Sequence, residues 1–112
     1  MADWKAILKE EKARGGVAAK ALSETTTGFS ALHKAAMADG AIPGKMKELM
    51  ALSIAISRQC EGCIAVHAQA CARAGASREE VADAVSVAIL MGGGPSYSYG
   101  AKAIEAFDAL SA

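Results

Sequence analysis

Two cysteines three residues apart, Cys60 and Cys63, are followed by a histidine, His67. The sequence around them predicts a helix, in which residues three or four apart share a face. The Cα atoms of the two cysteines would then lie roughly 5–6 Å apart, a separation that a disulfide bond tolerates. An imidazole four residues after Cys63 could accept the thiol proton or stabilise the thiolate. The spacing therefore predicts a redox-active dithiol served by His67.

A third cysteine, Cys71, falls on the same predicted face. If residues 60–71 form one helix, the three cysteines and His67 lie within a stripe about 80° wide. Zinc also takes cysteine and histidine ligands, but Cys60 and Cys71 would lie roughly 16 Å apart along the helix axis. Zinc holds its ligands at about 2.0–2.3 Å, so one straight helix cannot supply all four. We therefore expect no metal site and no other cofactor, and we interpret Cys71 as a packing residue.

Upstream of the cysteine pair, Glu48 shares a helix face with apolar residues. A carboxylate on a buried face would suit a proton shuttle that works near neutral pH. Lys45 and Lys47 stand close by in the sequence, so an exposed acid in the first turn of that helix is an equally good interpretation. The other histidine, His33, lies beside an apolar stripe and is interpreted as a boundary residue.

Positive and negative side chains balance, with 12 Lys plus Arg against 12 Asp plus Glu. A protein that binds a nucleic-acid backbone or an anionic membrane surface needs an excess of basic residues, so neither nucleic acid nor a membrane is expected as a partner. Hydrophobic residues make up 53 % of the chain, too many for a disordered protein. No window reaches the roughly 18 unbroken apolar residues of a membrane span, and the charged N-terminal segment does not resemble a signal peptide. We therefore expect a cytoplasmic protein, whose thiols are kept reduced.

The apolar periodicity predicts an all-α fold, a single-domain bundle of about six helices over residues 1–112. Asp3 would cap a short N-terminal helix, about residues 3–13, which stops before Gly15-Gly16. A second helix would end with Gly40 in a left-handed conformation. Because a small domain of Ala-rich helices leaves much surface to cover, we also expect a homo-oligomer.

The second half of the chain is marked by clear helix boundaries. Residues 45–59 form a helix that is apolar on most sides, as a central element would be. A further helix covers about residues 61–74, and a capping box formed by Ser77 and Glu80 opens the next. The Gly92–Pro95 segment lacks the Lys-Ser/Thr of a phosphate loop, so it predicts a close helix–helix corner. The last helix would pack through one side, formed by Tyr97, Ala101, Ile104 and Phe107.

The stretch from Asp39 to Phe107 resembles the alkyl hydroperoxidase D-like, carboxymuconolactone decarboxylase family. It covers about two-thirds of the chain. The motifs that carry the resemblance are the Asp39-Gly40 pair, K-x-x-E-L-x-x-L followed by C-x-x-C-I-x-x-H (45–67), A-G-A-S-R-E-E-V (74–81), A-I-L-M-G-G-G-P (88–95) and Y-G-A-K-A-I-E-A (99–106).

The resemblance implies an all-helical antioxidant-type fold that assembles as trimers or hexamers, with its active site near a subunit interface. In the redox branch of the family, the cysteine pair cycles between dithiol and disulfide while it reduces a hydroperoxide, and an external dithiol or redox partner protein restores it. The resemblance implies that Cys63 attacks the hydroperoxide and that Cys60 resolves the sulfenic acid. It likewise implies that His67 and Glu48 form the proton relay. The sequence departs from the family at Gly62, where relatives with well-established peroxidase activity often carry a histidine.

Together, the spacing of the cysteines and His67 and the family resemblance predict a thiol-dependent peroxidase or disulfide reductase. One alternative is a carboxymuconolactone decarboxylase-like lyase in which His67 is the acid/base and the cysteines are incidental. Because the resembling decarboxylases lack the cysteine pair, the dithiol counts against a lyase. The other alternative is a non-catalytic, redox-sensing helical module.

Overall fold

The chain folds into six helices and no strand, which confirms the predicted all-α class. The structure is a computed structural model and describes residues 1–112 throughout. The helices are α1 (Trp4–Ala21), α2 (Ser23–Met37), α3 (Gly44–Ser57), α4 (Glu61–Arg73), α5 (Arg78–Gly92) and α6 (Gly94–Leu110). No helix is long and apolar enough to cross a membrane.

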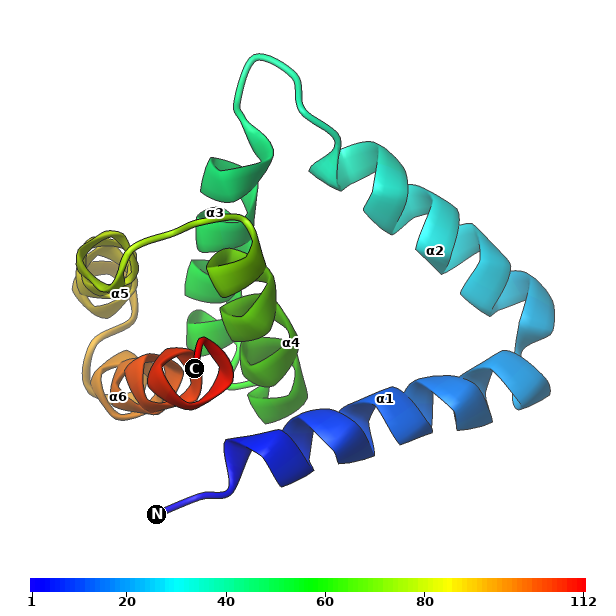
Figure 1. The fold of residues 1–112 in the computed structure, drawn as a ribbon, viewed down its shortest axis with the longest axis horizontal. Coiled ribbons are helices and arrows are strands. Elements are labelled where there is room, and N and C mark those ends of the chain that lie inside the picture. Colours follow the sequence, from blue (N-terminus) through cyan, green and yellow to red (C-terminus); the bar gives the residue numbers. More distant parts are fainter.

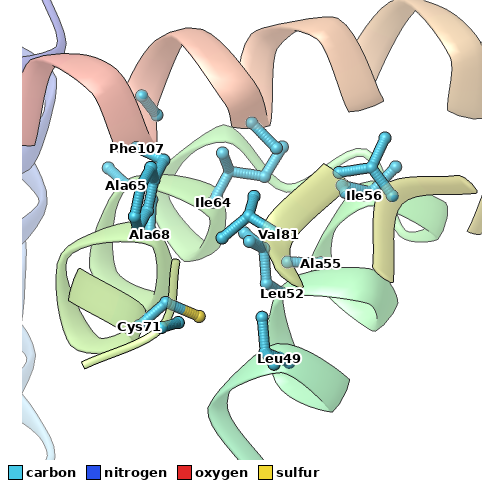
Figure 2. Close-up of a cluster of buried hydrophobic side chains, with 14 of the residues drawn as sticks. Leu49, Leu52, Ala55, Ile56, Ile64, Ala65, Ala68, Cys71, Val81 and Phe107 are labelled. Atoms are coloured by element: carbon cyan, nitrogen blue, oxygen red, sulfur yellow. The ribbon is translucent and has the colours of Figure 1, made fainter. Parts of the chain in front are cut away.

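The hydrophobic core lies among the last four helices, and α3 contacts each of the other three (Figure 1). The prediction that this mostly apolar helix is central is confirmed in part, because α3 packs against all three but Met50 and Ile54 on its other side are at least half exposed. α1 adds Trp4 and Leu8 to the same cluster. Figure 2 shows how side chains from α3, α4, α5 and α6 meet in this layer. Its fully buried side chains include Leu52, Ile56, Ile64, Cys71 and Val81.

Local capping explains where several helices begin and end. Asp3 accepts a hydrogen bond from the backbone N–H of Ala6 at the start of α1, and Ser77 with Glu80 forms the predicted capping box of α5. The Gly92–Pro95 segment separates α5 from α6 as predicted, with Gly93 at φ 72°. A left-handed residue at this corner lets two helices follow each other without a loop.

Two predictions about helix ends are wrong. α1 does not stop near residue 13 but continues through Gly15-Gly16 to Ala21, because each glycine costs only about 1 kcal/mol and good helix formers follow. Gly40 does not end α2 in a left-handed conformation, because α2 already ends at Met37. The ammonium group of Lys47 instead donates hydrogen bonds to two carbonyl groups at that end, so no left-handed residue is needed.

The predicted packing face of α6 is also only partly right. Phe107 is buried and Ile104 half-buried, but Tyr97 and Ala101 face solvent. α6 approaches α5 through small residues instead: a Cβ added at Gly100 would lie 2.7 Å from a methyl group of Val85. Large apolar residues therefore mark the buried face in the second half of this helix but not at its start.

α2 stands apart from most of the core (Figure 1). It packs against α1 and makes a few contacts with α3. None of its residues is buried, and even the large apolar side chains of Phe29 and Leu32 are 68 % and 63 % exposed. A helix that keeps such side chains in water has an apolar surface without a partner in this chain.

Candidate active site

The two cysteines lie side by side at the start of α4. Their sulfur atoms are at bonding distance as a disulfide, and their Cα atoms are 5.2 Å apart, within the predicted range. Cys63 belongs to the first turn, whereas Cys60 is the cap residue and has an extended backbone. The assumption that one helix contains both cysteines is therefore wrong by one residue, because α4 begins at Glu61. The two cysteines still pair, since the cap residue lies next to the first turn.

The turn before α4 positions Cys60. At the end of α3, the N–H of Gln59 donates to the carbonyl of Ile56 and the N–H of Cys60 donates to that of Ala55. This pattern is a Schellman motif, with Gln59 in the left-handed position at φ 55°. α4 ends in the same motif, but with Gly75 at φ 86° in that position. The turn next to the cysteines thus carries a side chain where glycine is usual, a form of strain found at functional sites.

The backbone of α4 also acts on the sulfur of Cys60. The N–H of Cys63 donates a hydrogen bond to this sulfur over 3.2 Å. The first turn of a helix carries partial positive charge, so a sulfur in this place is stabilised as a thiolate once the disulfide opens. Glu61 in the same turn would oppose this, but its carboxylate pairs with Lys102 at 3.5 Å.

His67 and Glu48 meet across the α3–α4 interface. The Nδ1 atom of His67 lies 2.8 Å from a carboxylate oxygen of Glu48, and their side chains are only 18 % and 15 % exposed. The interpretation of Glu48 as an exposed first-turn acid is therefore wrong. A carboxylate only accepts hydrogen bonds, so Nδ1 carries the proton and Nε2 keeps its lone pair. This arrangement prepares the imidazole to take a proton from another group.

The pair of His67 and Glu48 lies between two cavities. One cavity, of about 490 Å³, is lined by both cysteines and His67, together with Ala51, Ile54, Ala55 and Arg58. The other, of about 590 Å³, is lined by Glu48 and by several polar side chains, including Lys12, Asp39, Lys45, Gln69 and Arg73. A proton taken on the cysteine side can therefore be passed by way of Glu48 towards a polar exit.

His33 is a neighbour of the site that the sequence reasoning missed. Its ring stacks on that of His67, with centroids 6.2 Å apart and planes 28° from parallel. It is the contact that brings α2 against the site, although His33 was expected to be a boundary residue. No local spacing could reveal it, because its partner lies on a helix distant in the sequence.

Gly62, the residue between the cysteines where a histidine was expected from the resemblance, faces α1. A Cβ atom there would collide with the carboxyl group of Glu11. A histidine in this place would therefore displace Glu11, which pairs with Arg14 at 3.3 Å. α1 therefore lies close to the start of α4, and a side chain at this position would require Glu11 to move.

Cys71 lies in the core rather than in the site (Figure 2). Burial, with a smaller contribution from the negative charge of Glu48, raises the pKa of its thiol from 9.0 to about 12. It therefore stays protonated and inert near neutral pH, as its interpretation as a packing residue requires. No group of three or more histidine, cysteine or acidic side chains is arranged to hold a metal ion.

Comparison with known proteins identifies the family. The model of the carboxymuconolactone decarboxylase family matches residues 23–106, and the chain belongs to this family. The crystal structure of a family protein from Legionella pneumophila is 41 % identical and covers 97 % of both chains, with a TM-score of 0.94. A family protein from Thermotoga maritima is 29 % identical over 87 % of this chain and 89 % of its own, with a TM-score of 0.72. The description of the Thermotoga protein suggests involvement in an antioxidative response.

Curated relatives extend the likeness along the whole chain. An uncharacterised protein of Cupriavidus necator is 36 % identical over 98 % of this chain and 97 % of its own length. A protein encoded in the cox locus of Paracoccus denitrificans, also uncharacterised, is 34 % identical over 85 % of this chain and 86 % of its own.

The burial of Cys71 predicts how stability depends on pH. Between about pH 9 and 12 the unfolded chain releases a thiol proton that the folded chain keeps, so the free energy of unfolding falls as the pH rises. The Cys71 thiol contributes a decrease in the free energy of unfolding that approaches about 1.4 kcal/mol per pH unit. We expect urea denaturation at pH 8, 9 and 10.5 to show a steeper decline for the native chain than for Cys71→Ala. Equal slopes would contradict the assignment.

The contact between Glu48 and His67 predicts a loss of thiol reactivity in Glu48→Gln. The variant keeps a hydrogen-bond acceptor but loses the charge that stabilises an imidazolium, so fewer thiolates form at neutral pH. We expect alkylation of the reduced cysteine pair at pH 7 to slow by roughly tenfold, since a charged hydrogen bond contributes about 1.5–3 kcal/mol. The pH at which the alkylation rate reaches half of its maximum should be higher in Glu48→Gln than in the native protein.

Glu61→Gln is the matched control, because it removes the same charge from a residue that pairs with Lys102 instead. Its alkylation rate should not fall. If both variants behave alike, Glu48 has no specific role in the relay.

Proposed function

We propose that this protein is a thiol-dependent peroxidase or disulfide reductase, in which Cys60 and Cys63 cycle between dithiol and disulfide. One observation carries the proposal. The cysteine pair and His67 line the same cavity, while Glu48 holds the imidazole at 2.8 Å from the other side. The family membership and the antioxidative role suggested for the Thermotoga protein support it.

In the first step, His67 accepts the proton of the Cys63 thiol. The thiolate then attacks the terminal oxygen of a hydroperoxide, and the O–O bond breaks as the S–O bond forms. The alkoxide that leaves takes the proton back from the imidazolium. The products are an alcohol and a sulfenic acid on Cys63, so sulfur has lost the two electrons that the peroxide gained.

In the second step, the thiol of Cys60 attacks the sulfenic sulfur, water leaves, and the disulfide seen in the structure forms. An external dithiol or a redox partner protein then attacks the sulfur of Cys63. Cys60 leaves as a thiolate, stabilised by the N–H that already contacts its sulfur. The second thiol of the reductant completes the exchange. This cycle needs a reducing compartment, and we propose the cytoplasm.

The cycle predicts which cysteines are needed for turnover. With dithiothreitol as reductant and cumene hydroperoxide as substrate, we expect Cys63→Ser to lower alcohol formation by at least roughly a hundredfold. One equivalent of peroxide should remove two hydrogen masses from the native peptide that contains both cysteines, and dithiothreitol should reverse this. In Cys60→Ser, dimedone should trap a sulfenic acid on Cys63.

Cys71→Ala is the matched control, because it removes a thiol that lies outside the site, and it should retain turnover. Turnover that survives Cys63→Ser would contradict the proposal. A lyase predicts activity that resists thiol alkylation, and a redox-sensing module predicts one oxidation without turnover.

We also propose that the protein is a homo-oligomer, a trimer or hexamer, and that the exposed apolar side of α2 takes part in the contact. Phe29, Leu32 and Leu22 are all more than half exposed, and α2 buries no residue within the chain. Apolar side chains of this size, gathered on one helix, mark an interaction surface.

This assembly predicts a sedimentation mass several times the 11.4 kDa of one chain. Phe29→Glu should shift the mass towards a single chain, because a charge would be buried without a partner in the contact. Ser30→Glu introduces the same charge at a neighbouring exposed position and should perturb the assembly less. A mass of one chain for the native protein would contradict the proposal.

A further inference from the structure

The cavity beside the cysteines has an apolar wall. Ala51, Ile54 and Ala55 lie on α3 at spacings of three and four residues, so they share one side of that helix. Ile54 is 62 % exposed, an apolar surface that a ligand in this cavity could cover. The wall therefore favours a substrate with an apolar body rather than a small hydrophilic one.

Arg58 carries the only permanent charge among the residues that line this cavity. It lies one turn beyond the apolar wall, at the end of α3. Its guanidinium group makes no ion pair and no hydrogen bond, whereas Arg14 and Arg78 both pair with acidic side chains. An arginine presents a planar set of donors that matches a carboxylate.

The start of α4 adds to this positive potential, because Cys60 and Cys63 occupy the helix end where N–H groups point outwards. No acidic side chain lines the cavity. Glu61, the nearest acid in the sequence, is engaged by Lys102. An anionic group would therefore meet attraction from two sources and no acidic side chain in the cavity, with only the C-terminal end of α3 opposing it.

We propose that the preferred substrates are apolar hydroperoxides that carry a carboxylate, and that Arg58 binds this carboxylate. The proposal rests on the peroxidase function proposed above and specifies its substrate class. Arg58 binds one end of the molecule while the apolar part covers Ile54. The hydroperoxide group then reaches Cys63, whose thiolate takes the terminal oxygen as before. Arg58 does not touch the reacting atoms, so its effect is on substrate binding.

A matched pair of probes tests this proposal: cumene hydroperoxide bearing a para carboxylate, and the methyl ester of the same compound. The two have the same reactive group and differ in charge. With dithiothreitol as reductant, we expect the native protein to show a higher kcat/KM for the carboxylate. In Arg58→Gln, kcat/KM for the carboxylate should fall roughly three- to tenfold, mainly through KM, as for the loss of one partly exposed charge contact. The ester should change by less than about twofold.

Three controls separate binding from structure. Arg58→Lys should retain part of the preference, because it keeps the charge. Lys9→Gln removes an exposed charge of α1 and should leave the preference unchanged. Added salt should reduce the preference of the native protein and have little effect on Arg58→Gln.

The outcomes distinguish this inference from the function on which it rests. If Arg58 only offsets the dipole of α3, Arg58→Gln will lower the melting temperature and affect both probes equally, which overturns the inference. Equal kcat/KM for the two probes in the native protein also overturns it while leaving the peroxidase function intact. If neither probe is turned over, the proposed function fails and the inference fails with it.

Discussion

The contact between His67 and Glu48 is the constraint on which the site depends, because it requires α3 and α4 to lie close together. A turn of three residues joins these helices, so they run back along each other and residues on either side of the turn can meet. The carboxylate reaches the imidazole only if the helices pack closely. Buried side chains such as Leu52, Ile64 and Ala68 provide that packing (Figure 2). The core therefore sets the geometry of the site.

This contact also divides the chemistry of the site between two sides. The cysteines lie in a cavity with an apolar wall, which they share with His67. Glu48 also lines the more polar cavity, where a proton can leave. Its charge acts on the core as well, because it helps to raise the pKa of Cys71. Of the three thiols, only the pair at the start of α4 is thus available for redox chemistry.

The arm formed by α1 and α2 is less tightly integrated. α1 inserts Trp4 and Leu8 into the core and places the carboxyl group of Glu11 against Gly62, between the cysteines. α2 reaches the site through the stacking of His33 on His67 and through Met37, which lines the cavity of Glu48. α2 therefore contributes to the surroundings of the imidazole while most of its own surface stays in water.

Local spacing in the sequence was enough to predict the helical class, the capping box at Ser77, the central place of α3 and the pairing of Cys60 with Cys63, because each depends on residues within one or two turns. Local spacing could not decide whether Glu48 was exposed, and it could not show that His33 lies near the site. Both depend on contacts between separate helices. The end of α1 was wrong for a local reason, because two glycines cost too little to stop a helix when good helix formers follow them. The buried face of α6 was wrong because tertiary packing selected the small residues around Gly100 over the larger Tyr97.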